Sequence, residues 1–168
     1  MKISKPICIT FAGAIGSSKT PITNYLSTKL NLPVFNNDAI RSEILEDFGK
    51  FDSKEHMNRR DKMLGKIVKS KISFICDVSV DREWEMFNDI LIKNNYRWFI
   101  ISLDLSKKLL SKLYKIKGYN ESLAKIDQVF LDHENFVNKY AGEIGLRITD
   151  KNFKKRCEIS YKATIKLV

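Results

Sequence analysis

The sequence predicts an α/β protein built on a parallel β-sheet with helices on both faces. Short apolar runs, which read as strands, alternate along the whole chain with longer amphipathic segments, which read as helices. The third and fourth apolar runs each end at a carboxylate, Asp77 and Asp104. A glycine-containing loop, residues 13–20, lies between the first strand and the first helix. A buried parallel sheet accounts for all three observations.

Five strands are expected, over residues 7–11, 32–36, 72–77, 97–103 and 146–149. Pro33 suits the entry of an edge strand, because proline cannot donate a ladder hydrogen bond. Seven helices are expected, over residues 20–30, 38–48, 53–71, 81–95, 106–116, 120–140 and 152–167. Their expected caps are Asn37 or Asp38, Ser53 and Asn120, and their expected stops are Gly49 and Gly118.

The length of 168 residues predicts one domain over residues 1–168, with no repeat or linker. No apolar run approaches the ~20 residues that a membrane helix needs. The segment 1–6 leads directly into the first strand and leaves no room for a signal peptide, so we expect a cytoplasmic protein. The three cysteines form neither a metal spacing nor a disulfide framework, and Cys8 and Cys76 read as core residues.

The net charge of +10 favours a polyanionic partner. Only seven of the 30 basic residues are Arg, however, and Lys lacks the planar fork that recognises phosphate in two places at once. The chain is also rich in Asn and Ile, and a joint bias toward Lys, Asn and Ile often reflects the base composition of the genome. Nucleic acid is therefore the less favoured of the substrate classes.

The loop 13–20 has the pattern of a phosphate-binding loop. Its residues are Gly13, Ala14, Ile15, Gly16, Ser17, Ser18, Lys19 and Thr20, close to the pattern G-x-x-x-x-G-K-[ST]. Backbone N–H groups of such a loop surround an anion, and the next helix points its positive end at it. Lys19 would then reach the β- and γ-phosphates of a nucleotide, and Thr20 would ligate Mg²⁺. The alternative is a Gly/Ser turn that happens to precede a lysine.

Polar residues that follow other apolar runs complete the candidate site, because ligands bind beyond the carboxyl ends of parallel strands. Asp77 is the candidate second metal ligand, or alternatively a cap for the next turn. Asp38 is the candidate proton acceptor, or alternatively a helix cap. Arg41 would clamp a substrate anion, or would only pair with Asp38 three residues earlier. His56 and His133 read as structural or surface residues away from this rim.

The loop, the segment Asn36-Asn37-Asp38-Ala39-Ile40-Arg41 and the strand ending in Asp77 together resemble the small P-loop kinases. This group includes 5′-polynucleotide kinases, zeta toxins, and gluconate and chloramphenicol kinases. Asp38 and Arg41 match the group's S-x-D-x-x-R segment, in which the Asp acts as base or orients the acceptor hydroxyl. The resemblance covers about residues 7–105. It implies the P-loop NTPase fold with strand order 2-3-1-4-5, ATP and Mg²⁺ as cofactors, and a mobile lid within residues 106–120.

Two departures from that group stand out. Ser18 occupies the position of the second glycine, which places a Cβ where backbone and phosphate approach closely. The segment 104–140 contains no Arg, although the group usually places arginines there. Lys115 and Lys117 are the candidate lid cations, and Arg82 or Arg156 would have to supply a guanidinium from elsewhere.

The sequence thus favours an ATP-dependent phosphotransferase that acts on a hydroxyl of a small molecule or of a nucleic-acid end. The alternative is a catalytically inert nucleotide-binding module that signals through a partner, which Ser18 and the Arg-free lid favour. A basic nucleic-acid-binding domain fits the charge but leaves the loop unexplained. The acceptor and the oligomeric state cannot be read from the sequence.

Overall fold

The computed structural model describes residues 5–168. A parallel sheet with the strand order β2-β3-β1-β4-β5 forms its centre. The strands are β1 (Ile7–Ala12), β2 (Val34–Phe35), β3 (Phe74–Ser79), β4 (Arg97–Asp104) and β5 (Ile144–Thr149). Because β1 pairs with both β3 and β4, the loop after β1 leaves the middle of the sheet. The predicted fold class and strand order are confirmed, while residues 1–4, predicted to lead into β1, lie outside the described part.

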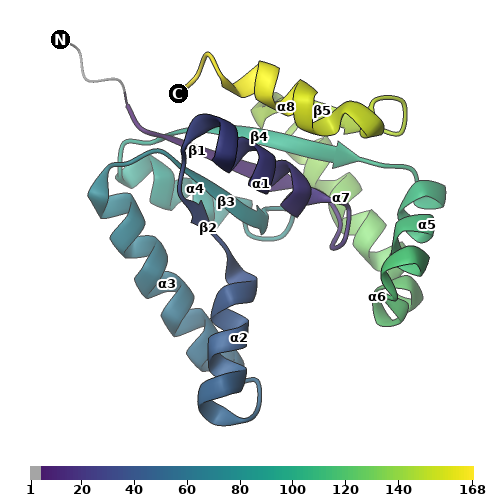
Figure 1. Ribbon diagram of the computed structural model, residues 1–168, viewed down its shortest axis with the longest axis horizontal. Helices are drawn as coiled ribbons and strands as arrows, with labels where there is room; N and C mark the ends of the chain where they lie inside the picture. Colours follow the sequence, from purple (N-terminus) through teal and green to yellow (C-terminus); the bar gives the residue numbers. More distant parts are fainter. Residues whose placement is uncertain (1–4) are drawn as a thin grey trace.

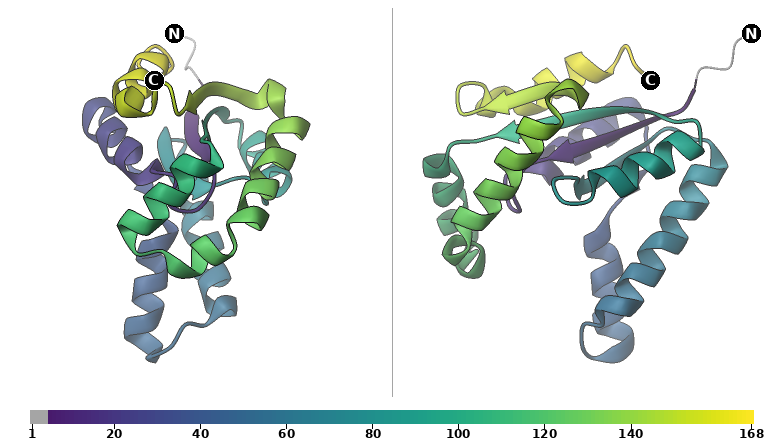
Figure 2. Two further views of the ribbon diagram at one scale, coloured as in Figure 1. Left: turned by 90° about the vertical axis from the view of Figure 1, so that its right-hand side faces the viewer. Right: turned by 180° about the vertical axis from the view of Figure 1, so that it is seen from behind.

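Helices cover both faces of the sheet (Figures 1 and 2). They are α1 (Lys19–Leu30), α2 (Asn37–Phe48), α3 (Ser53–Ser70), α4 (Trp84–Lys93), α5 (Lys107–Lys117), α6 (Asn120–Ala124), α7 (Ile126–Lys139) and α8 (Arg156–Thr164). Short 3-10 turns, Ala141–Glu143 and Phe153–Lys155, flank β5. Helices α1 and α8 lie on one face, and α4 and α7 on the other. None of the helices described in residues 5–168 combines the length and apolar character needed to cross a membrane.

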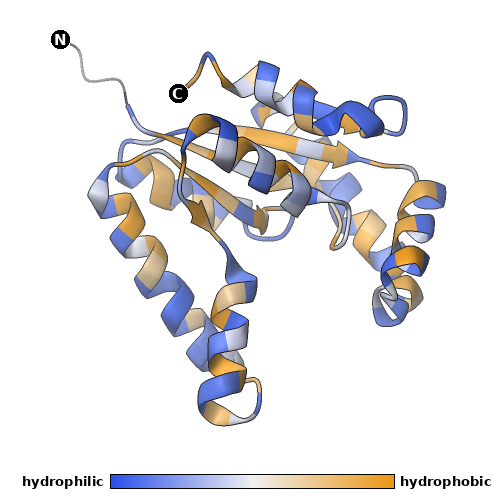
Figure 3. Ribbon diagram, viewed as in Figure 1, coloured by the Kyte–Doolittle hydropathy of each residue, from blue (hydrophilic) through white to orange (hydrophobic). Residues whose placement is uncertain are grey.

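The core consists of one apolar layer on each side of the strands. Ile9, Phe11 and Ile101 of the sheet pack with Ile22 and Leu26 of α1. On the opposite face, the core residues come from the sheet and from α2, α3, α4 and α7: Cys8, Phe74, Cys76, Ile100, Ile44, Leu64, Trp84, Leu91 and Phe136. Figure 3 shows the apolar strands between helices whose outer faces are hydrophilic. The predicted burial of Cys8 and Cys76 is confirmed.

Helices α2 and α3 form a hairpin that projects beyond the edge of the sheet (Figure 1). Arg59 of α3 ties the two helices together. Its guanidinium contacts Asp47 of α2 at 2.7 Å and Glu55 of its own helix at 2.8 Å. It also lies over the ring of Phe48 at the end of α2. Charge and aromatic contacts thus join the helices where the sheet no longer supports them.

Three predicted helix caps are wrong. Asn120 does not cap a helix but is the first residue of α6, and Tyr119 precedes it without a side-chain capping bond. Asp52 caps α3 instead of Ser53, and its carboxylate accepts from the N–H groups of Lys54 (2.9 Å) and Glu55 (3.0 Å). The charged carboxylate also suits the positive end of the helix better than a hydroxyl does. Asn36 caps α2 instead of Asn37 or Asp38, with its side chain accepting from the Asp38 N–H at 2.7 Å.

The predicted helix over residues 120–140 is two helices, α6 and α7, which meet at Lys125. Leu123 before the break and Ile126 after it both belong to the apolar cluster that includes Tyr114 of α5. Helical periodicity alone does not reveal such a bend, because the apolar spacing continues through it. The last predicted helix is also shorter, with α8 occupying residues 156–164 of the expected 152–167.

Candidate nucleotide-binding site

The loop between β1 and α1 keeps a backbone shape that normally calls for glycine. Ser18 has φ 85° and ψ 33°, in the left-handed region, at the position where the usual pattern has its second glycine. Gly13 (φ 138°) and Gly16 (φ 70°) also have positive φ. The Cβ of Ser18 therefore does not prevent the loop from adopting the left-handed conformation, although a side chain there is strained relative to glycine.

Lys19 folds back across this loop. Its Nζ donates to the carbonyl oxygens of Gly13 (3.0 Å) and Ala14 (2.7 Å). Burial lowers the pKa of Lys19 to about 8, against the opposing effect of the nearby carboxylates of Asp81 and Asp77. The ammonium group is thus held against the loop carbonyls, partly desolvated and within the electrostatic influence of these carboxylates.

Helix α5 and the turn after it pack directly on the same loop. A Cβ on Gly16 would lie 2.9 Å from the Tyr114 ring and 3.0 Å from the Tyr119 ring, so only glycine allows this approach. Lys117 Nζ donates to the Gly16 carbonyl at 2.7 Å. Of the two lysines predicted in the lid, Lys117 contacts the loop, and Lys115 is exposed on the same helix.

The two arginines considered as substitutes for lid arginines have different surroundings. Arg82 pairs with Asp132 of α7, its Nε donating at 2.7 Å. Arg156, at the start of α8, lies over the Phe153 ring with its guanidinium carbon 4.3 Å from the centroid. Burial and the charge of Arg156 both lower the pKa of Lys117. Arg156 is therefore the arginine that lies near the loop and the lid.

The predicted carboxylate and hydroxyl positions have different relations to Lys19. Asp77 and Asp38 both act electrostatically on Lys19. Thr20 follows Lys19 at the start of α1 and is exposed. Asp77 lies within β3 and does not end it, since β3 continues to Ser79. The structure thus brings Lys19, Asp38 and Asp77 to one region at the carboxyl end of the sheet.

Neither alternative reading of Asp38 and Arg41 fits the structure. Asp38 does not cap α2, because Asn36 does so, and its side chain is exposed. Arg41 lies over the ring of Phe51, with its guanidinium carbon 4.4 Å from the centroid. Arg41 is therefore directed toward the α2–α3 connection and away from the partner that an (i, i+3) ion pair would have required.

A buried ionic network beside the loop was missed by the sequence analysis. Asp81, in the connection between β3 and α4, accepts from the Gly13 N–H at 3.0 and 3.2 Å. His133 of α7 contacts Asp81 through Nδ1 (3.2 Å) and Asp104 through Nε2 (3.0 Å). Arg147 of β5 donates to Asp104 at 2.6 Å. The prediction that His133 lies away from the rim is wrong.

The burial of His133 could have been inferred from helical spacing. His133 lies three or four positions from Val129, Phe130, Phe136 and Val137, on the buried stripe of α7. A polar residue on such a stripe requires buried hydrogen-bond partners. The sequence could not name them, because Asp81 and Asp104 come from other elements.

The contacts in this network set the charge of its members. Although burial lowers it, hydrogen bonds to Asp104 and Asp81 raise the pKa of His133 to about 9. Burial raises the pKa of Asp104, but hydrogen bonds from His133, Ser102 and Arg147 outweigh it and lower the value to about 2. At neutral pH the network therefore holds a protonated histidine next to an ionised carboxylate.

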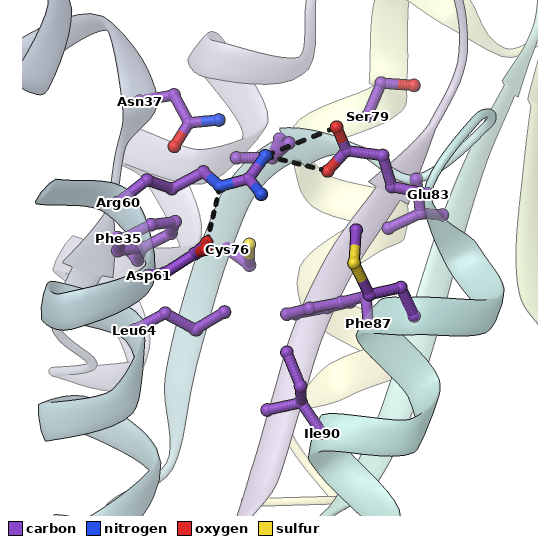
Figure 4. Close-up of a pocket in the computed structure, with 13 residues that line it drawn as sticks. Phe35, Asn37, Arg60, Asp61, Leu64, Cys76, Ser79, Glu83, Phe87 and Ile90 are labelled. Carbon is purple, nitrogen blue, oxygen red and sulfur yellow. Dashed lines mark hydrogen bonds and ion pairs between the residues drawn. The ribbon is translucent and has the colours of Figure 1, made fainter. Parts of the chain in front are cut away.

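A cavity of about 90 Å³ opens between α3 and α4, next to the carboxyl end of β3 (Figure 4). Its walls are mostly apolar and include Phe35, Leu64, Cys76, Phe87 and Ile90. Arg60 of α3 spans it to reach Glu83 with two hydrogen bonds, at 3.0 and 3.2 Å, and also contacts Asp61.

Polar atoms at the edge of this cavity relate it to the loop site. The buried Oδ1 of Asn37 has no hydrogen-bond partner. Asn37 precedes Asp38 in the chain, and Val78 and Ser79, which also line the cavity, follow Asp77. The cavity therefore borders the segments that carry both carboxylates.

Comparison with known proteins gives structural matches only. No family model matches the sequence, and no curated protein matches it. A gluconokinase from Sinorhizobium meliloti 1021 is similar, with a TM-score of 0.66 at 11% identity over 97% of this chain and 94% of that one. An APS kinase from Mycobacterium tuberculosis, solved with AMPPNP and APS, gives a TM-score of 0.62 at 13% identity over 96% and 98%. A deoxyadenosine kinase from M. mycoides gives 0.61 at 17% identity over 96% and 100%.

These matches extend along nearly the whole of each chain and agree with the strand order. At such low identity they establish the fold, and the residues of this chain must supply the argument about activity. The loop after β1, the parallel order β2-β3-β1-β4-β5 and the similarity to solved kinases lead to one conclusion: the chain has the fold of the small P-loop kinases.

Proposed function

We propose that the protein is an ATP-dependent phosphotransferase that transfers a phosphoryl group to a hydroxyl. The observation that carries this proposal is the placement of Lys19 inside the loop, with Asp77 and Asp38 both close enough to act on its charge. Phosphoryl transfer depends mainly on positioning and on neutralising charge, and these residues suit both tasks. A cytoplasmic location is part of the same proposal.

The residues around the loop fit a nucleotide with Mg²⁺. Within residues 5–168, Ser17 Oγ is buried in the loop without a hydrogen-bond partner, and the acceptors that Lys19 contacts are two loop carbonyls. Among the described residues no cluster of three or more His, Cys, Asp or Glu could hold a metal alone. Mg²⁺ in such sites takes one or two protein ligands and completes its shell with phosphate and water. Thr20 and Asp77 would be those ligands, and the bound ion would neutralise charge on the phosphates.

The protein residues then have separate roles. Lys19 exchanges its carbonyl partners for phosphate oxygens, and Lys117, now on Gly16, is placed to contact the same phosphates. Asp38 accepts the proton of the acceptor hydroxyl or orients it. Arg41 stays a candidate anion clamp only if it leaves the Phe51 ring, on which it now lies.

The acceptor is expected to bind in the cavity next to Asp38. Arg60, the cation at this cavity, is already neutralised by Glu83 and Asp61, so it offers no free charge to an anionic acceptor. The walls are apolar, and Asn37 Oδ1 is available to accept a hydrogen bond. These features favour an uncharged acceptor with an apolar portion over a sugar acid or a nucleic-acid end.

This preference can be measured directly. Labelled ATP is incubated with the protein and a panel of acceptors: nucleosides, amino sugars, gluconate, shikimate and RNA with 5′-hydroxyl ends. We expect phosphorylation among the uncharged compounds, because binding an anion next to the paired Arg60 would leave that anion without a partner. The Leu64→Phe variant fills the cavity and should raise KM for the acceptor without changing ATP affinity. Preferential phosphorylation of gluconate, shikimate or RNA would contradict the preference.

A second candidate function is an inert nucleotide-binding module. Ser18 in the loop and the absence of Arg from segment 104–140 favour it. Such a module would bind Mg·ATP but phosphorylate none of the acceptors in the panel. The phosphotransferase is favoured because Asp38 is exposed and does not serve as the cap of α2, while the preceding Asn37 lines a cavity, features that nucleotide binding alone does not require.

Replacing Asp77 tests the metal site. The Asp77→Asn substitution keeps the side-chain shape but removes the charge that a Mg²⁺ ligand supplies. We expect the variant to need at least tenfold more Mg²⁺ for half-maximal nucleotide binding, while its melting temperature without ligand stays near that of the parent. Mg²⁺ titrations of nucleotide binding measure this, with Asp89→Asn, exposed on α4, as the control. Superimposable titrations for Asp77→Asn and the parent would make Asp77 a structural residue.

A further inference from the structure

The loop site includes a residue held from both sides by ionic groups. The N–H of Gly13 donates to both oxygens of Asp81, and the carbonyl of Gly13 accepts from Lys19. Gly13 begins the loop and has φ 138°, a conformation that does not favour any side chain. A Cβ there would also meet Leu103 and Ser17 at 3.1 Å. The direction in which the loop leaves β1 is therefore set at Gly13, and Asp81 fixes its N–H.

Asp81 is itself held by His133. The side chains of Asp81 and His133 are 8% and 9% exposed, so water is not the main partner of either. His133 uses both ring nitrogens on carboxylates, Nδ1 on Asp81 and Nε2 on Asp104. A neutral imidazole has only one N–H, and its other nitrogen would then point a lone pair at a carboxylate. Both ring nitrogens donate only in the doubly protonated ring, which is the form that these two contacts favour.

Charges alternate from the loop to the far edge of the sheet. The charged groups, in order, are Lys19 of α1, Asp81 of the β3–α4 connection, His133 of α7, Asp104 of β4 and Arg147 of β5. Asp104 contacts both His133 and Arg147, and Asp81 contacts His133 and the Gly13 N–H. Burial favours the neutral amine of Lys19, and the nearby charge of Asp81 opposes this effect.

We propose that His133 is a positioning residue for nucleotide binding: it holds Asp81 against the Gly13 N–H, so that the loop is formed before phosphate arrives. Identifying the ligand as a nucleotide phosphate rests on the proposed function. The geometric part of the proposal states that the protonation of His133 controls the contact between Asp81 and Gly13. This part does not depend on the proposed function.

The pH dependence follows from the position of His133. With a folded pKa of about 9, above the ordinary 6.5, the contribution of His133 to stability is complete below pH 6.5 and is lost as pH rises through about 9. Above that pH the neutral ring keeps a single N–H and can no longer donate to Asp81 and Asp104 together, so its hold on Asp81 weakens and the Gly13 contact loosens. Lys19 loses its own proton near pH 8, also weakening phosphate binding, so an affinity profile alone cannot isolate His133.

The first experiment therefore needs no nucleotide. The ring signals of His133 and the backbone nitrogen of Gly13 are followed by carbon-detected NMR between pH 6 and 10. We expect His133 to titrate near pH 9 and the Gly13 nitrogen shift to follow the same midpoint, with His56 as the internal reference. If the Gly13 shift ignores the midpoint of His133, or if His133 titrates near 6.5, the proposal is overturned.

The second experiment measures the dissociation constant of Mg·ATP at pH 7 for His133→Gln, Asp81→Asn and the double variant. Each single substitution should weaken binding about tenfold, the size expected for one charge-assisted hydrogen bond. The double variant should be no weaker than the worse single one, because both act through the same contact. Glu134→Gln, exposed on the same helix, is the matched control.

The outcomes separate the two proposals. A folded His133→Gln variant that binds Mg·ATP like the parent overturns the positioning role. So does a double variant whose loss equals the sum of the two single losses. If the parent itself binds no Mg·ATP, the proposed function fails. The Gly13 titration then decides by itself whether His133 controls the loop, and it also decides if His133→Gln does not fold.

Discussion

Replacing Lys19 with alanine is expected to abolish most of the rise in melting temperature that Mg·ATP gives the parent protein. A ligand that binds only the folded state stabilises it by about 2.7 kcal/mol at a hundred times its Kd. For a domain of this size that corresponds to roughly 5–10 °C. Without the Lys19 ammonium group, the loop loses the cation that its carbonyls now hold in place. Thermal unfolding with increasing Mg·ATP measures the effect.

Lys29→Ala is the matched control, because Lys29 is exposed at the other end of the same helix. It should keep the full Mg·ATP response. The variant without Lys19 should also fold, because an alanine leaves the backbone of the loop unchanged. An unaltered ligand-induced shift in Lys19→Ala would show that phosphate does not bind at this loop, and the nucleotide site would have to be sought elsewhere.

Replacing Asp38 with asparagine is expected to lower turnover by ~10²–10⁴-fold, the usual contribution of a general base, while ATP affinity stays near the parent value. Asp38 is exposed on the first turn of α2, and Asn36 takes the capping role. The substitution therefore removes a proton acceptor without removing a helix cap. A loss confined to kcat indicates an interaction that is made in the transition state.

The measurement uses the best acceptor from the panel with labelled ATP, and nucleotide affinity is determined separately. Glu46→Gln, exposed on the same helix, should turn over like the parent. Turnover by Asp38→Asn at the parental rate would remove Asp38 from the chemistry. A parent that phosphorylates no acceptor at all, yet binds Mg·ATP, would favour the inert nucleotide-binding module.

The fold could be predicted largely from local patterns. Apolar runs ending at polar residues marked the strands, and the loop 13–20 marked the turn between β1 and α1. Periodicity did less well where a helix bends without losing its apolar spacing, as at Lys125. Periodicity also does not show which of two adjacent residues caps a helix. Asp52 and Ser53 are both good caps, and the structure uses the Asp52 carboxylate.

The candidate site was predictable to the extent that strand ends collect its residues. The electrostatic effect of Asp38 and Asp77 on Lys19 agrees with that rule, and the assignment of these residues to a site stays a prediction. The rule does not reveal the network of Asp81 and His133, because a histidine on a helix gives no indication of which carboxylates it meets. The lid contact with Gly16 escaped it for the same reason, since Tyr114 and Tyr119 are about a hundred residues away in sequence.

The α2–α3 hairpin has a mechanical consequence for the acceptor site. Arg59 joins its two helices by contacts to Asp47 and Glu55, while the hairpin projects beyond the edge of the sheet (Figure 2). The base of the hairpin is also fixed, because Ile44 of α2 and Leu64 of α3 lie in the core and Arg60 pairs with Glu83 at the start of α4. Asp38 on α2 and Arg60 on α3 therefore belong to one braced unit. The spacing between Asp38 and the α3 wall of the cavity is set by this unit as a whole and not by either helix alone.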